Sequence, residues 1–134
     1  MMMCNIGVVK HRFSTKEAPV FATITITLLL AAACLVPAAG KLLALPQMQA
    51  SAAHFGIPWS RYRLIGIAEL AAAGGILAGL AVPAFGVLAA AGMIALLGVA
   101  LFVHRRAGDS PRVAIPAFVA LGLSVVYLAL ITTH

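Results

Sequence analysis

The chain has 134 residues, of which 63% are hydrophobic and only 9% are charged, and its mean hydropathy is +1.11. Soluble domains carry about 25% charged residues, and a small soluble domain buries too little surface to hide so much apolar area. The composition therefore excludes an ordinary soluble domain and indicates an integral membrane protein. The net charge of +6 does not indicate a nucleic-acid partner, because the basic residues flank apolar stretches, as in membrane helices. The lipid bilayer is the expected partner.

The charged residues fall in clusters separated by apolar stretches of about 20 residues, the length of a helix that crosses a bilayer. After a basic N-terminal tail over residues 1–18, the rest of the chain, residues 19–134, is predicted to be one membrane domain. Helices satisfy their own backbone groups in lipid. The expected fold class is therefore all-α, an integral membrane four-helix transmembrane bundle, with predicted spans over residues 19–40, 63–82, 84–103 and 113–131.

The first span is predicted to start at Pro19 and to be kinked by Pro37 near its far end. The same region has the basic, apolar and small-residue order of a signal sequence, and Cys34 stands where a lipoprotein processing site would have its cysteine. However, the apolar run continues past Cys34 to Gly40, which favours a retained transmembrane helix over a cleaved signal.

The segment between the first two spans is mixed in character. A short amphipathic helix is predicted near residues 48–54, with Trp59 and Tyr62 at the membrane interface. The second and third spans are separated only by residues 82–84, which predicts a tight antiparallel hairpin.

Basic residues give a weak prediction of orientation. The two longer loops lie on one side of the membrane and contain six basic residues, whereas the termini and the hairpin turn lie on the other side with three. The count favours cytoplasmic loops and outside termini.

Glu69 is the most informative residue of the sequence. It lies six positions beyond Arg63, which is about 9 Å along a helix and therefore inside the hydrocarbon region. An acidic side chain there usually faces protein, is protonated or has a cationic partner. At helical spacing Glu69 flanks a stripe of small residues suited to close helix packing, namely Ala68, Ala72, Gly75 and Gly79.

The predicted topology indicates which residues could be partners of Glu69. In an antiparallel four-span arrangement, Lys41 and His104 reach the same membrane face as the start of the second span. We expect a polar intramembrane or juxtamembrane site of Glu69, Lys41 and His104. Three interpretations remain open: an ion pair that only fixes helix register, a site for proton transfer or for a polar head group, and a snorkelled or protonated Glu69 with no particular role.

The usual signatures of catalysis and metal binding are missing from the sequence. His54, His104 and Glu69 have no recognised metal-ligand spacing, and Cys4 and Cys34 form no CxxC pair. No phosphate loop, nucleophile elbow or pair of catalytic carboxylates occurs. We therefore predict no metal site and assign no catalytic residue; whether the protein is an enzyme stays open, with a non-catalytic role favoured.

Four runs of sequence stand out together: KLLALPQM from Lys41, HFGIP from His54, RLIGIAEL from Arg63 and VHRRAGD from Val103. In this order they resemble the DoxX-like family of small, mostly bacterial, four-helix membrane proteins. The order and spacing agree from about Leu28 to the C-terminus. The resemblance implies that Lys41, Gly66, Glu69 and His104 occupy polar or close-packed positions of the family. Ala38 departs from it, because the family often has glycine three residues before the lysine.

The resemblance also suggests a function. Members are associated with thiosulfate:quinone oxidoreduction and with redox or oxidative-stress complexes, which implies an accessory subunit of a redox or quinone-linked complex in the bacterial plasma membrane. No cofactor is identifiable from the motifs, although a quinone would be compatible with this role, and the expected protein partner is an oxidoreductase or a second copy of the chain. The alternatives are a small proton-coupled transporter and a membrane-protein assembly factor.

Overall fold

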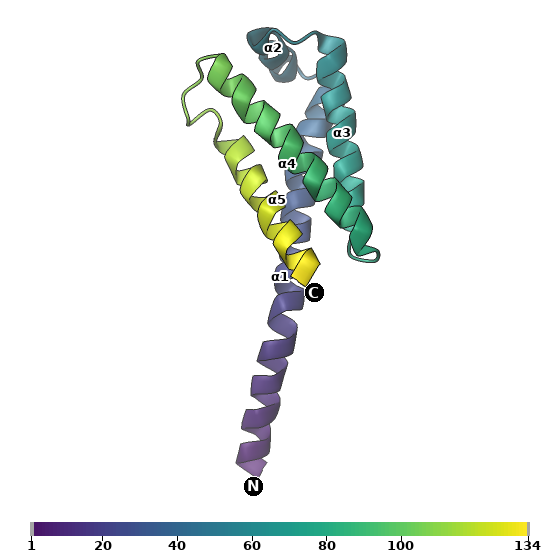
Figure 1. The fold of residues 1–134 in the computed structure, drawn as a ribbon, viewed down its shortest axis with the longest axis vertical. Helices are drawn as coiled ribbons and strands as arrows, with labels where there is room; N and C mark the ends of the chain where they lie inside the picture. Colours follow the sequence, from purple (N-terminus) through teal and green to yellow (C-terminus); the bar gives the residue numbers. More distant parts are fainter. Residues whose placement is uncertain (1, 134) are drawn as a thin grey trace.

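The computed structural model describes the backbone of residues 2–133 and the side chains of residues 19–133. This part of the chain is all-helical and contains five helices (Figure 1). They are α1 (Met2–Leu42), α2 (Pro46–Phe55), α3 (Trp59–Ala78), α4 (Pro83–Arg106) and α5 (Ile115–Thr133).

The four longer helices pack in a closed order. Helix α1 packs against α3 and α5, and α4 completes the ring by packing against the same two helices. The short helix α2 and the α4–α5 connection lie at one end, whereas the α3–α4 turn and the C-terminus lie toward the other (Figure 1). The N-terminal part of α1 extends well beyond the other helices. This arrangement brings the ends of α1 and α4 and the start of α3 to the same end as α2.

Three helices are long and apolar enough to cross a membrane: α1 from Pro19 to Leu42, α4 and α5. The sequence prediction of four spans therefore holds for three by length and composition. Helix α3 falls outside this group because its 20 residues include Arg61, Arg63 and Glu69. It is nevertheless packed between α1 and α4 within the helix assembly.

The candidate span Pro19–Leu42 agrees with the first predicted span, but several helices extend differently from the predicted spans. Helix α1 begins at Met2, so Pro19 lies inside the helix rather than at its start, and the predicted tail is part of the same helix. A proline removes one backbone hydrogen bond from a helix interior but does not always end the helix. Helix α3 begins at Trp59, directly after Pro58, and ends before Gly79, four residues earlier at each end than the predicted span.

The predicted short helix in the connecting segment is confirmed as α2. Pro46 occupies its first turn, where a missing N–H is harmless. Gly56 ends it with a left-handed backbone (φ 67°), a conformation that glycine adopts without steric cost. The side chain of Tyr62 is buried against the other helices.

The interior combines residues from all four longer helices. Leu30 and Cys34 of α1 pack with Ile76 of α3, Met93 of α4 and Tyr127 of α5. Many large apolar side chains point outward instead, among them Val36, Phe102 and Val119. Such an exposed apolar exterior suits lipid as the surrounding solvent.

Near the α3–α4 turn, Tyr127 fastens the last helix to α3. Its hydroxyl donates a hydrogen bond to the carbonyl of Ile76 at 2.9 Å. The amide of Leu80, which would normally bond that carbonyl, instead reaches Leu77 in the closing turn of the helix. Tyr127 thereby satisfies one of the carbonyl groups that a helix C-terminus leaves without a partner.

The space for this contact depends on two glycines. A Cβ atom added to Gly79 would collide with the Tyr127 hydroxyl and would lie 2.7 Å from the Cα of Gly86 on α4. The hairpin can therefore close tightly, and Tyr127 can reach Ile76, because residues 79 and 86 have no side chains.

We expect Gly79→Ala to destabilise the protein by about 1–3 kcal/mol, the usual cost of overpacking. Gly74→Ala on the same helix is the matched control, because a Cβ there meets nothing within 4 Å. Gly74→Ala should leave the free energy of unfolding unchanged or raise it by up to about 1 kcal/mol, because alanine has the higher helix propensity. Unfolding in mixed detergent micelles measures both; equal effects of the two substitutions would contradict the packing argument.

Candidate functional site

A buried ion pair joins α1 to α3. Lys41 Nζ donates a hydrogen bond to Glu69 Oε2 at 2.8 Å, and the two side chains are only 7% and 10% exposed. The ammonium also lies over the ring of Tyr62, 5.2 Å from its centroid, within the range of a cation–π interaction. A charge taken out of water is costly, and these contacts offset part of that cost for each partner.

Gly66 allows α1 and α3 to approach closely beside this pair. A Cβ atom on Gly66 would lie 2.8 Å from the Cβ of Lys41. Gly66 is one helical turn before Glu69, so both residues lie on the face of α3 that meets α1. The short contact between the helices thus lets the lysine side chain reach the carboxylate.

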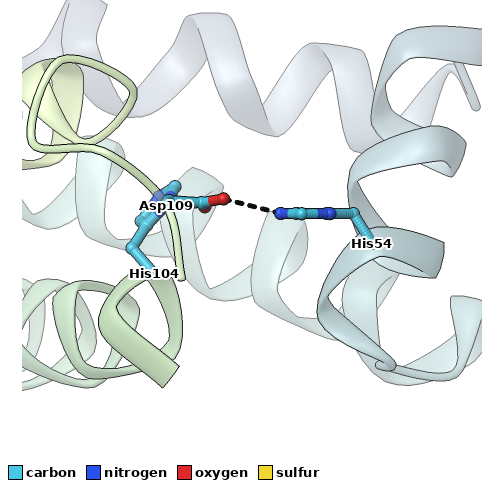
Figure 2. Close-up of polar contacts among 3 residues, drawn as sticks. All are labelled: His54, His104 and Asp109. Atoms are coloured by element: carbon cyan, nitrogen blue, oxygen red, sulfur yellow. Dashed lines mark hydrogen bonds and ion pairs between the residues drawn. The ribbon is translucent and has the colours of Figure 1, made fainter. Parts of the chain in front are cut away.

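His104 has a different carboxylate partner. Its Nδ1 lies 2.7 Å from Asp109 Oδ2, while His54 Nε2 of α2 lies 2.7 Å from the other oxygen, Oδ1 (Figure 2). A carboxylate can only accept hydrogen bonds, so both of these ring nitrogens carry the proton that faces Asp109. Topology offered both Lys41 and His104 as neighbours of Glu69; the structure places Lys41 there and His104 in this second cluster.

The end of α4 explains how Asp109 reaches His104. Gly108 has a left-handed backbone (φ 78°), and the amide of Asp109 bonds back to the carbonyl of His104 at 3.1 Å. This reversal after the last helical turn is typical of a glycine-terminated helix. The edge of the His104 ring also packs against Phe55 of α2, with ring centroids 4.9 Å apart. The cluster therefore ties α2 to the α4–α5 connection.

Asp109 is held in its charged form by the two histidines. The hydrogen bonds from His54 and then His104 lower the pKa of its carboxyl below the usual 3.8. Of the three side chains, His54 is the exposed one, with 53% of its surface accessible. The cluster thus lies at the border between the interior and the surrounding medium.

A cavity of about 1050 Å³ is lined by residues of both clusters. Its titratable lining residues include Lys41, Glu69 and the His54–Asp109–His104 cluster, and Gln47 and Ser51 add further polar groups. The remaining wall is largely apolar and includes Val36, Met93, Leu97, Val103 and Ala117. A largely apolar cavity with a few fixed polar groups is typical of a site for a small molecule.

The small residues of α3 have two different neighbours. Gly75 faces α4, where an added Cβ would lie 2.8 Å from the Cβ of Ala89, and Gly79 meets Gly86 and Tyr127. Ala68 and Ala72 line a shallower groove between α3 and α4. Gly66 packs on α1 instead, so it belongs to the ion-pair contact and not to the stripe.

The chemistry of these groups is acid–base and hydrogen bonding. Among the side chains of residues 19–133, no group of three or more His, Cys, Asp or Glu residues is arranged to hold a metal ion. Cys34 is buried and unpaired in this part of the chain. The sequence analysis did not predict that Asp109 and His54 belong to one polar cluster. The sequence hint was Gly108-Asp109 after α4, which is typical of a chain reversal at the end of a helix.

We expect removal of either partner of the ion pair to cost about 3–5 kcal/mol, because the remaining charge would be buried alone. The double variant Lys41→Met/Glu69→Gln should cost clearly less than the sum of the single variants. A double-mutant cycle on detergent-solubilised protein measures this coupling, with Arg63→Gln at an exposed position of α3 as the control. Additive single effects would show that the two side chains do not interact.

Asp109→Asn should lower the unfolding temperature at neutral pH, because the charged carboxylate accepts both histidine hydrogen bonds. The folded pKa is depressed, so this stabilisation is present above 3.8, the unfolded value, and is lost as the pH falls through the lower folded pKa. The difference between wild type and variant should therefore vanish in strong acid. The exposed neighbour Ser110→Ala is the control; a difference that does not depend on pH would contradict the assignment.

The match to known families covers most of the helical assembly. The family model of the DoxX-like family matches residues 25–127, which include the ion pair, the histidine–aspartate cluster and the cavity wall between them. No curated protein and no solved structure matches the chain. With the apolar helices described above, this match shows that the chain is a membrane protein that belongs to the DoxX-like family.

Proposed function

We propose that this protein is an accessory subunit of a redox or quinone-linked membrane complex. In this arrangement α3 is the fourth transmembrane helix, and the end of the bundle with α2 and the α4–α5 connection faces the cytoplasm of a bacterial cell. The Lys41–Glu69 pair and the cavity beside it would dock an oxidoreductase partner or the head group of a quinone.

The observation that carries this proposal is the position of the ion pair. Lys41 and Glu69 are nearly buried and border a cavity of about 1050 Å³. Charged groups inside a membrane bundle are costly and often mark functional sites. An accessory role fits the chemistry, because the described cavity contains groups that bind and orient a molecule but offers no activated nucleophile.

The same pair supports the proposed placement of α3 in the membrane. Its charges count against it as an independent span, yet Glu69 is neutralised by Lys41 at 2.8 Å. Arg61 and Arg63 lie in its first turns, where long basic side chains reach the head-group region. Helix α3 is therefore suited to cross the bilayer when α1 is already beside it.

The test is purification of the tagged protein from native membranes in mild detergent, followed by mass spectrometry and by an assay of quinone reduction in the same membranes. We expect an oxidoreductase to co-purify with the wild type and Arg63→Gln, and several-fold less of it with Glu69→Gln. Deletion of the gene should slow quinone reduction.

Recovery of the protein alone, with unchanged quinone reduction after deletion, would overturn the proposal. Glu69-dependent solute flux in liposomes would then favour a proton-coupled transporter. Loss of another membrane protein from the deletion strain, without flux, would favour an assembly factor.

A further inference from the structure

The polar groups beside the cavity have unused hydrogen-bonding capacity. Glu69 Oε2 accepts from Lys41, but the second carboxylate oxygen has no hydrogen-bond partner among the described residues. The ammonium of Lys41 has three N–H groups, and Glu69 is the only acceptor that they reach among the described residues. Since both side chains line the cavity, a molecule inside it can use the remaining donor and acceptor sites.

The charge of the cavity restricts which molecule fits. Lys41 and Glu69 neutralise each other, and Asp109 is hydrogen-bonded by two histidines. None of the arginines lines the cavity. A charged head group beside this neutral pair would lose its own hydration without meeting a net opposite charge. An uncharged head group avoids both costs.

The rest of the wall favours a long apolar body. Leu97 and Val103 of α4 and Ala117 of α5 are among the apolar residues that line the cavity. Val36 and Val119 also line it and are more than half exposed, so the apolar wall continues onto the lipid-facing surface. A molecule dissolved in the bilayer can therefore enter with its chain along these helices.

We propose that the cavity binds a neutral, hydroxyl-bearing lipid, with its hydroxyl between Lys41 and Glu69 and its chain along α4 and α5. A hydroxyl is suited to this position because it donates to the free oxygen of Glu69 and accepts from Lys41 at once. The inference rests on the proposed function for the place of the ion pair within the membrane, but it needs no protein partner.

The test uses three photoreactive probes on the purified full-length protein in nanodiscs: hexadecanol, hexadecanoic acid and hexadecylamine, each with the same diazirine on its chain. Hexadecanol should label cavity residues saturably, and unlabelled hexadecanol should compete. The acid and the amine should label these residues about tenfold less, because each would lose its hydration beside a pair with no net charge. Peptide mapping should place the label near Leu97 and Ala117, and not at the outward-facing Leu88.

Charge variants give a readout that a purely structural pair would not produce. Glu69→Gln leaves Lys41 as an unpaired cation and should shift the preference to hexadecanoic acid. Lys41→Met leaves the carboxylate and should shift it to hexadecylamine. Ala100→Trp and Ala117→Phe, which reduce the cavity, should abolish saturable labelling, whereas Leu88→Trp should not; a single symmetric elution peak shows that each variant is folded.

Equal labelling of cavity and outer surface, equal labelling by all three probes, or no change of preference in the charge variants would overturn this inference. Its failure is distinct from failure of the proposed function. An oxidoreductase that co-purifies while hexadecanol does not label the cavity would leave the accessory role intact. Saturable labelling without any oxidoreductase partner would leave the binding site intact.

Discussion

The buried ion pair between Lys41 and Glu69 is the constraint on which the rest of this structure depends. A single charge at this depth would be strongly unfavourable, so each side chain requires the other, and α1 must lie directly against α3. Gly66 permits that approach, and Tyr62 places its ring below the ammonium. One electrostatic requirement thus sets the contact of two helices and the polar end of the cavity between them.

The second polar cluster acts on a different part of the molecule. Asp109 lies in the connection between α4 and α5, yet His54 reaches it from α2. The cluster therefore holds the short helix over the end of the bundle, where residues of α2 such as Met48 and Phe55 line the cavity. Both clusters contribute to the lining of the same cavity, and the apolar side chains of the lining are left to meet lipid or a bound molecule.

The sequence predicted the helical class and the family because both follow from strong, local signals: apolar runs of membrane length and short motifs in a fixed order. Glu69 stood out because a carboxylate is rare in such a run. The His54–Asp109 contact was missed because 55 positions separate the two residues and neither is unusual near a surface. The start of α3 was misplaced because Trp59 and Arg61 have the polarity of a loop but lie in a helix that follows Pro58. Hydropathy alone does not mark α3 as a candidate span, and hydropathy takes no account of the cationic partner that Glu69 finds on another helix.

The hydrogen bond from Tyr127 to the carbonyl of Ile76 has a consequence for the order in which the molecule is assembled. The ribosome synthesises α3 before α5. The carbonyl of Ile76 at the end of α3 therefore receives its hydrogen bond from Tyr127 only after α5 has been made. Lys41, in contrast, is already present when Glu69 is made. The nascent chain can therefore close its charged contact early, whereas the opposite end of the bundle becomes complete only after α5 has been made.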